Sequence, residues 1–256
     1  MPHWTSFKTS AEVRTYFLDL GKQIRGGTLN IGRINYSLNL ALGVWQAIVC
    51  GYDHIAAVEV GVARGGGLLD LCKAAAYFTE ETGIKIDVYG FDNATGLPPT
   101  LDYRDHPELW AQGQFKMQDA DELRAQLPPF AKLIIGDVKD TIRDLEGMLG
   151  GARLGFVSID VDYYSSTVPA MEMFKFDRDL NVPALPIYFD DVLKLISYND
   201  WCGEALAIRE FNDANTVRKV QQHDGRKLYI AHILDHKIRT GEEKLRPRFT
   251  LHVSPI

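Results

Sequence analysis

The feature that most constrains the fold of this chain is a series of five short apolar runs separated by longer segments. Each run is rich in Val, Ile or Phe and ends at a polar or glycine-rich turn, and several of the intervening segments have helical patterns. This alternation is typical of βαβ units that form a parallel sheet buried on both faces. The expected strands are Ile55–Val60, Ile84–Phe91, Lys132–Ile135, Leu154–Ile159 and Ala184–Phe189.

The first 50 residues have a different pattern, which predicts two helices. Apolar residues recur at helical spacing over Glu12–Gln23, and Leu38–Val49 is almost entirely apolar. We therefore expect an N-terminal helical cap over residues 1–50 and a doubly wound, mostly parallel α/β domain over residues 51–256. The two parts are expected to form one compact unit.

Two further features of the sequence lie outside this alternating pattern: a pair of late apolar runs and one long irregular segment. The apolar runs Lys227–Ile233 and Arg248–Val253 predict a closing antiparallel pair of strands. The longest irregular segment is Asn93–Gly113, which contains several Gly and Pro residues. Long loops in compact domains are often functional, so we expect this segment to form a lid over a ligand site.

Composition excludes several classes of function. The chain has 28 Lys and Arg against 34 Asp and Glu, a net charge of −6, which argues against non-specific binding to nucleic acid or to an anionic membrane. Three cysteines without a C-x-x-C pattern indicate neither a disulfide framework nor a zinc site. No run approaches the ~20 apolar residues that a bilayer span needs, and the first residues lack the pattern of a secretion signal. We therefore expect a cytoplasmic protein.

The turn after the first expected strand carries the strongest indication of a ligand. Glu59 lies in the strand end, and Gly61, Gly65 and Gly66 precede a helix expected over Leu68–Phe78. Glycines let the backbone approach a ligand, and a helix N-terminus offers free N–H donors. The spacing matches neither the dinucleotide fingerprint nor the P-loop. A carboxylate would repel a pyrophosphate but suits an ammonium or a sulfonium, which favours S-adenosylmethionine over NAD. The alternative is a tight turn that binds no ligand.

The next two strands each end at an aspartate. Asp92 follows the second strand, and its carboxylate can accept both hydroxyls of a ribose. The alternative is a cap on the following turn. Asp137 follows the third strand, where it would lie near an adenine, and the alternative is an N-cap for a helix over Val138–Leu145.

Four carboxylates follow the fourth and fifth strands: Asp160, Asp162, Asp190 and Asp191. They lie at the edge where open α/β sheets bind ligands. Like charges at such short range repel, and one pKa rises unless a cation lies among them. Hard oxygen ligands without His or Cys indicate Mg²⁺, with Ca²⁺ or Mn²⁺ as further options. The alternative is a set of helix caps and salt bridges.

Five of these segments together resemble a known enzyme family. They read, in order, EVGVARGGG, YGFDNATGLP, IIGDVKDT, FVSIDVDYYSST and YFDD, and they extend over about Val58–Asp191. The series resembles the macrocin-type (TylF-like) family of class I O-methyltransferases. The resemblance implies a Rossmann-like sheet and the methylation of a hydroxyl, including sugar hydroxyls on natural products, by S-adenosylmethionine, generally with Mg²⁺.

The same resemblance assigns roles to individual residues. Asp92 would bind the ribose of the cofactor, and Asp137 would lie near its adenine. The methionine end would be held by Glu59, Gly61, Arg64, Gly65 and Gly66, and the metal by Asp160, Asp190 and Asp191. We expect Asp162 to act in catalysis as the general base, beside Asp160.

Two other functions stay open on the sequence. A NAD- or nucleotide-dependent α/β enzyme would need phosphate-compatible glycines without the charge of Glu59. A non-catalytic S-adenosylmethionine-binding protein would share the fold, although the retained aspartates speak against it. The expected partners are a small-molecule hydroxyl acceptor and, in a homo-oligomer, further copies of the chain.

Overall fold

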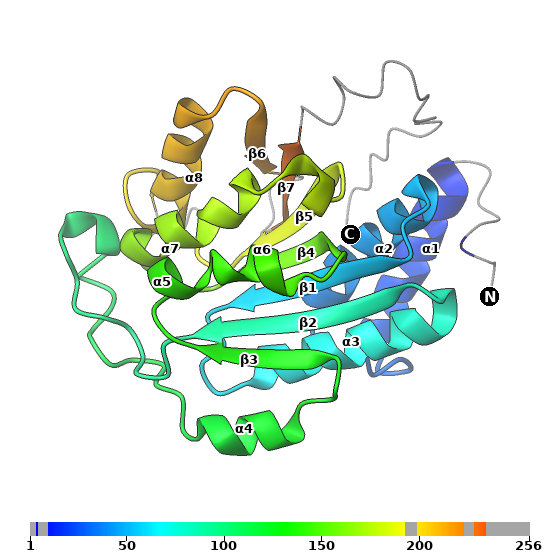
Figure 1. Cartoon of the computed structure of the whole chain (residues 1–256), viewed down its shortest axis with the longest axis horizontal. Helices are drawn as coiled ribbons and strands as arrows, with labels where there is room; N and C mark the ends of the chain where they lie inside the picture. Colours follow the sequence, from blue (N-terminus) through cyan, green and yellow to red (C-terminus); the bar gives the residue numbers. More distant parts are fainter. Residues whose placement is uncertain (1–3, 5–9, 193–198, 223–227, 234–256) are drawn as a thin grey trace.

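The structure is a computed structural model that describes residues 4, 10–192, 199–222 and 228–233. Its centre is a seven-stranded sheet with the strand order β3-β2-β1-β4-β5-β7-β6. Strands β1 to β5 are parallel to one another, and β7 runs antiparallel to β5 and β6. This arrangement confirms the predicted doubly wound, mostly parallel α/β sheet (Figure 1).

All five strands predicted for the parallel part are present, with ends shifted by at most one residue. Their bounds are β1 (His54–Val60), β2 (Lys85–Asp92), β3 (Ala131–Ile135), β4 (Arg153–Ile159) and β5 (Ala184–Phe189). In β1 and β4 every residue except the first is buried. Near-continuous burial is the pattern expected of central parallel strands that are covered on both faces.

The antiparallel edge differs from the expectation in its partners. The predicted strand Lys227–Ile233 is observed as β7 (Leu228–Ile233). It pairs with β5 and with β6 (Arg218–Gln222), which the sequence pattern did not indicate. The other predicted member of the pair, Arg248–Val253, lies outside the described residues.

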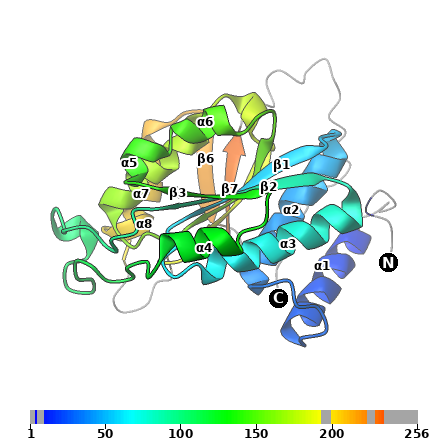
Figure 2. The same cartoon turned by 60° about the horizontal axis from the view of Figure 1, so that its bottom comes forward.

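Helices cover both faces of the sheet (Figure 2). One face carries α2, α3 and α4, and the opposite face carries α5 to α8. The helices are α1 (Ser10–Arg25), α2 (Ile34–Cys50), α3 (Gly66–Thr82), α4 (Ala120–Gln126), α5 (Val138–Thr141), α6 (Asp144–Met148), α7 (Tyr164–Ala170) and α8 (Gly203–Ala214). Short 3₁₀ segments of the described chain include η2 (Tyr103–Asp105), η3 (Met171–Lys175) and η4 (Arg178–Leu180).

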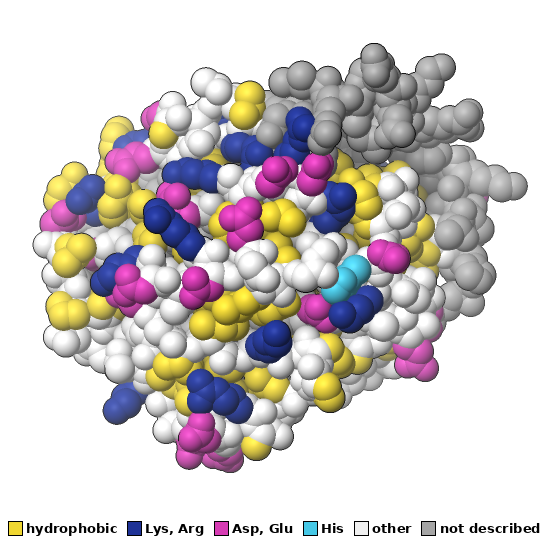
Figure 3. All heavy atoms as spheres, viewed as in Figure 1, with side chains coloured by type: hydrophobic (Ala, Val, Ile, Leu, Met, Phe, Trp, Pro, Cys, Tyr) yellow, Lys and Arg dark blue, Asp and Glu magenta, His cyan; other side chains and the backbone are white. Residues whose placement is uncertain are grey.

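Within the described residues, no helix has both the length and the apolar character that crossing a membrane requires. On the face drawn in Figure 3, acidic and basic side chains are interspersed between apolar ones. Among the described residues drawn on that face, no large area has a single charge sign.

The two helices predicted within the first 50 residues are confirmed as α1 and α2. Helix α2 lies directly on β4 and β5, and α1 packs against α2. The backbones of α2 and β4 are in direct contact at Gly43 and Gly155. A Cβ atom on Gly43 would lie only 2.0 Å from the carbonyl oxygen of Gly155. This contact sets the first turn of α2 beside the carboxyl ends of the central strands.

We expect Gly43→Ala to lower the free energy of unfolding by about 1–3 kcal/mol, because the added methyl group overpacks a contact between two backbones. Urea denaturation measures this change. Gly21→Ala in α1 is the control, since its nearest neighbour would be Leu38 Cδ1 at 3.8 Å, an ordinary contact. That variant should be neutral or stabilised by up to ~1 kcal/mol. Equal stability of the two variants would contradict the close approach of α2 to β4.

Candidate active site

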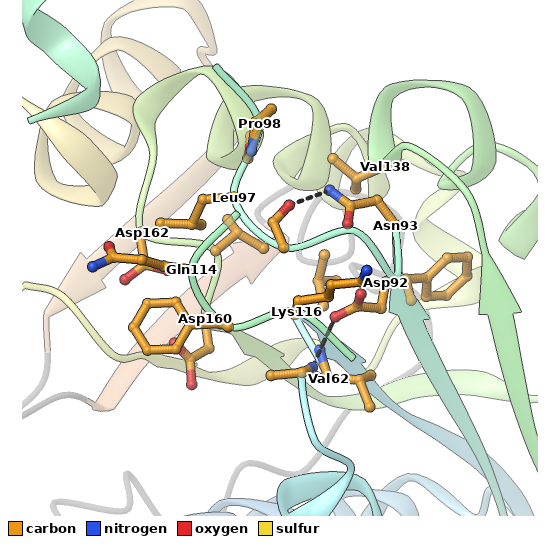
Figure 4. Close-up of a pocket in the computed structure, with 18 of the residues that line it drawn as sticks. Val62, Asp92, Asn93, Leu97, Pro98, Gln114, Lys116, Val138, Asp160 and Asp162 are labelled. Atoms are coloured by element: carbon orange, nitrogen blue, oxygen red, sulfur yellow. Dashed lines mark hydrogen bonds between the residues drawn. The ribbon is translucent and has the colours of Figure 1, made fainter. Parts of the chain in front are cut away.

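A cavity of about 1370 Å³ lies at the carboxyl ends of β1, β2, β4 and β5. Of the residues predicted for the site, all except Gly65 line it. The predicted lid segment also contributes, since Leu97, Pro98 and Trp110 line the same cavity. Figure 4 shows Leu97, Gln114 and Asp162 among the residues that line this cavity, and the hydrogen bond between Val62 and Asp92. One cavity therefore holds the glycine turn, the aspartates and the long loop.

The glycine turn depends on left-handed backbone conformations. Gly61 has φ 89°, and a Cβ atom there would lie 1.8 Å from the carbonyl oxygen of Asp160. Gly61 therefore lets the end of β1 contact the end of β4. Gly65 has φ 86°, and a Cβ atom there would lie 2.4 Å from Leu123 Cδ1 of α4. Gly65, the residue before the first turn of α3, therefore leaves room for the Leu123 side chain of α4.

Glu59 is buried at the end of β1, with its side chain held by a chain of hydroxyl groups. Tyr36 of α2 donates a hydrogen bond to Glu59 Oε1 at 2.8 Å, and Ser158 donates one to Tyr36 Oη at 2.8 Å. Gly67 leaves space for this carboxylate, because a Cβ atom there would lie 2.0 Å from Oε1. The second oxygen, Oε2, is buried and has no hydrogen-bond partner among the described residues.

Burial is the main electrostatic influence on Glu59. The pKa of the carboxyl is raised from 4.5 to about 8, mainly by burial and to a smaller extent by the charges of Asp160 and Asp92. The hydrogen bond from Tyr36 and the charge of Arg33 act in the opposite direction. A buried carboxylate with one open oxygen is suited to a ligand that brings a positive charge or an N–H donor.

Asp92 ties the end of β2 to the glycine turn. Its Oδ2 accepts hydrogen bonds from the backbone N–H groups of Val62 at 2.9 Å and Ala63 at 2.8 Å (Figure 4), and Oδ1 accepts one from Ala94 at 2.6 Å. The capping alternative is therefore present. Each carboxylate oxygen can accept two hydrogen bonds, so Oδ1 keeps capacity for another donor. Contact with a ribose stays a prediction.

Asp137 also has the capping contacts that were the alternative for it. It is the N-cap of α5, where it accepts a hydrogen bond from the Lys139 N–H at 3.1 Å and forms an ion pair with Lys139 Nζ at 2.9 Å. It nevertheless lines the cavity. Its place near an adenine is untested.

The structure brings three of the four strand-end aspartates together. Asp160, Asp162 and Asp191 each offer a carboxylate oxygen within 4.8 Å of the others. Asp190 is not part of this group, and its carboxylate accepts a hydrogen bond from the Tyr188 hydroxyl. The geometry thus differs from the predicted metal set in including Asp162 and leaving out Asp190.

Asp162 has an unusual backbone conformation. Its φ is 60°, and the N–H of Tyr163 donates to the carbonyl oxygen of Val161 at 2.5 Å, which closes a three-residue γ-turn. Such strained conformations concentrate at functional sites. Burial raises the pKa of Asp162 to about 9, with further contributions from Asp191, Asp160 and Asp190. Like charges held this close favour a proton or a cation among them.

A fourth carboxylate near this group was not predicted. Glu204, in the first turn of α8, is fully buried, and its Oε2 accepts a hydrogen bond from the Asp191 N–H at 2.8 Å. Its Oε1 has no hydrogen-bond partner among the described residues. No sequence motif marks Glu204 or Tyr36, and Ser158, although it lies within the segment FVSIDVDYYSST, was not singled out. Their roles depend on contacts between elements that are distant in the chain.

The group formed by Asp160, Asp162 and Asp191 fits a hard divalent cation. All its donors are carboxylate oxygens, which Mg²⁺, Ca²⁺ and Mn²⁺ prefer. The buried, unpartnered oxygen of Glu204 adds an acceptor beside it. A cation would offset the repulsion that raises the pKa of Asp162.

We expect the stability of the ligand-free protein to fall as pH rises from about 5 to about 8. A raised carboxyl pKa means that the folded state binds a proton that the unfolded state has released, so this contribution is complete below the unfolded value of 4.5 and is lost as pH rises through about 8. In Glu59→Gln the difference in unfolding free energy between these pH values should shrink by on the order of 1–3 kcal/mol.

Thermal and urea unfolding in EDTA measure this pH profile. Glu146→Gln, which removes an exposed carboxylate of α6, is the control and should keep the profile of the unmodified protein. A profile that is the same for Glu59→Gln and Glu146→Gln would mean that Glu59 is ionised across this range.

Comparisons with known proteins bear on the fold. No protein-family model matches the sequence, and no curated protein matches the chain. Among solved structures, the calicheamicin methyltransferase CalS11 is similar, with a TM-score of 0.56 and 18% identity over 87% of this chain and 91% of that one. Its apo form, described as a TDP-rhamnose 3'-O-methyltransferase, gives a TM-score of 0.47 at 16% identity, over 87% and 92%. The O-methyltransferase TomG from Streptomyces achromogenes gives 0.43 at 12%, over 91% and 99%. The chain therefore has the class I, Rossmann-like methyltransferase fold.

Proposed function

We propose that this protein is an S-adenosylmethionine-dependent O-methyltransferase of the macrocin type, and that it uses a divalent cation, Mg²⁺ in the first place, to methylate a hydroxyl of a small molecule such as a sugar or another natural product. One observation carries the proposal. A single cavity holds both the glycine turn with Glu59 and Asp92 and the carboxylate group of Asp160, Asp162 and Asp191. The fold shared with the calicheamicin methyltransferase supports it.

The cofactor side of the cavity is formed by the first three strand ends. The open oxygen of Glu59 suits the positive charge at the methionine end of S-adenosylmethionine, and Arg64 lies on the same turn. Gly61 and Gly66 allow the close approach of the ligand to the backbone. Asp92 Oδ1 retains capacity for a ribose hydroxyl, and Asp137 lies toward the adenine end.

The acceptor side combines the carboxylate group with apolar residues of the long loop. Leu97, Trp110 and Phe115 line the cavity and are proposed to face the acceptor. They can exclude water and pack against an apolar part of the acceptor. Holding two reactants in line in such a site can supply up to ~7–11 kcal/mol of the barrier reduction.

Asp160 and Asp191 are the proposed cation ligands, because they belong both to the metal set expected from the sequence and to the observed carboxylate group. A divalent cation held there lowers the pKa of a hydroxyl group and offsets the charge that develops on its oxygen. Asp162 is proposed to accept the proton of the acceptor hydroxyl, because its buried carboxylate lines the cavity beside both ligands. Asp190, whose carboxylate accepts a hydrogen bond from the Tyr188 hydroxyl, lies outside this group and is proposed to contribute less to cation binding.

Cofactor binding is tested first, by calorimetry. We expect S-adenosylmethionine and S-adenosylhomocysteine to bind with micromolar affinity, on the order of −8 kcal/mol. Asp92→Ala should weaken binding by about 1.5–3 kcal/mol, since it removes an acceptor for the ligand and the anchor of the turn. Asp87→Asn on the same strand is the control, because that side chain pairs with His54. Binding of NADH without binding of S-adenosylmethionine would refute the proposal in favour of a nucleotide-dependent enzyme.

Turnover over a panel of hydroxyl acceptors tests the cation and the base. EDTA should abolish methyl transfer and leave cofactor affinity nearly unchanged, because the cofactor contacts come from other strand ends. Asp162→Asn should lower kcat by ~10²–10⁴ with Mn²⁺ affinity retained, whereas Asp160→Asn should raise the Mn²⁺ requirement.

Three results would contradict these assignments. Equal activity in EDTA and in Mg²⁺ would show that the carboxylates are structural. Loss of Mn²⁺ binding in Asp162→Asn would make that residue a cation ligand. Cofactor binding without turnover on any acceptor would favour a non-catalytic binding protein.

A further inference from the structure

The N-terminus of α8 contacts both turns that carry the carboxylate group. Gly203 has φ 55°, and a Cβ atom there would lie 3.3 Å from the carbonyl oxygen of Asp162. The next residue, Glu204, accepts the N–H of Asp191 at 2.8 Å. The helix thus begins between the end of β4 and the end of β5.

The side chain of Glu204 is poorly compensated where it lies. It is 0% exposed, and its Oε1 has no hydrogen-bond partner among the described residues. The charges that act on it most strongly are those of Asp191, Asp160 and Asp162, all of them negative. A buried carboxylate oxygen without a donor costs free energy, and several like charges nearby increase that cost. As an acceptor for the Asp191 N–H alone, a neutral amide would serve equally well.

We propose that Glu204 is a positioning residue for a divalent cation held by Asp160 and Asp191. Oε2 fixes the turn after β5 through the Asp191 N–H, so that the Asp191 carboxylate faces Asp160. Oε1 is left to accept a hydrogen bond from the hydration shell of the cation. This inference rests on the proposed function, in which those aspartates bind the metal, and it adds a role for α8.

The test uses Mn²⁺ alone as the probe, with binding followed by electron paramagnetic resonance of the free ion. Removing a carboxylate that supports the ligands of a metal site typically weakens metal binding by ~10–100-fold. Glu204→Gln should weaken Mn²⁺ binding within that range. In EDTA the same variant should keep a melting temperature close to that of the unmodified protein, because Gln retains the acceptor for the Asp191 N–H, and burial raises the pKa of the Glu204 carboxyl so that little charge is removed. A role limited to the Asp191 N–H would leave Mn²⁺ affinity unchanged, since Gln keeps that acceptor.

Glu210→Gln is the matched control on the same helix. Its exposed carboxylate accepts a hydrogen bond from the Tyr164 hydroxyl, and neither Mn²⁺ affinity nor the melting temperature should change appreciably. If Glu204→Gln does not fold, Glu204→Asp retains the charge and shortens the reach to the Asp191 N–H. That variant should show the same loss of affinity.

Unchanged Mn²⁺ affinity in whichever Glu204 variant folds would overturn the role of Glu204, while leaving the proposed function in place. Absence of Mn²⁺ binding by the unmodified protein would overturn both.

Discussion

The arrangement of this site is dominated by carboxyl groups buried near the carboxyl ends of parallel strands, among them Glu59, Asp162 and Glu204. Isolated carboxylates are expensive to remove from water, so each needs donors or a counter-charge. Backbone N–H groups stabilise Asp92, and the Tyr36 hydroxyl stabilises Glu59. The N–H of Asp191 serves Glu204 in the same way. Glu59 and Glu204 each keep one oxygen without a hydrogen-bond partner among the described residues. Glu59 lies on the proposed cofactor side, and Glu204 lies beside the proposed cation ligands.

Close contacts between backbones allow these charges to gather. Gly61 lets the end of β1 touch the end of β4, and Gly43 lets α2 lie on β4. The second contact is what brings Tyr36 to Glu59 and Ser158, because the first turn of α2 then lies over the strand ends. A packing contact in the middle of a helix thus determines the hydrogen bonding of a carboxylate at the edge of the sheet.

The sequence predicted those parts of the molecule that follow from local pattern. Apolar runs identified β1 to β5, because strands buried on both faces require apolar residues. Glycine spacing identified the turn before α3, because left-handed backbone conformations favour glycine. Contacts between distant elements leave no such mark. Tyr36 and Glu204 therefore could not be found, and β6, whose exposed residues are polar, lacked the apolar pattern by which strands were recognised.

The different contacts of Asp190 and Asp191 could not be predicted from the sequence, because both residues lie beyond the last residue of β5, where strand alternation no longer applies. In the structure the Asp190 carboxylate accepts a hydrogen bond from the Tyr188 hydroxyl. Asp191 lies in the carboxylate group with Asp160, and its N–H donates a hydrogen bond to Glu204 at the start of α8.

The position of the Asp162 carboxylate depends on the backbone conformation of the turn after β4. Two residues apart on an extended chain, Asp160 and Asp162 would share a side but stand roughly 6.6 Å apart along it. The γ-turn at Asp162 shortens that span, and carboxylate oxygens of the two residues come within 4.8 Å. A left-handed non-glycine residue costs on the order of 1–3 kcal/mol, and the turn increases the repulsion between two like charges. Both costs are incurred in the ligand-free protein, and a cation held by Asp160 and Asp191 would offset the second. The strained turn is thus the local feature that brings the proposed base, Asp162, beside the proposed cation ligand, Asp160.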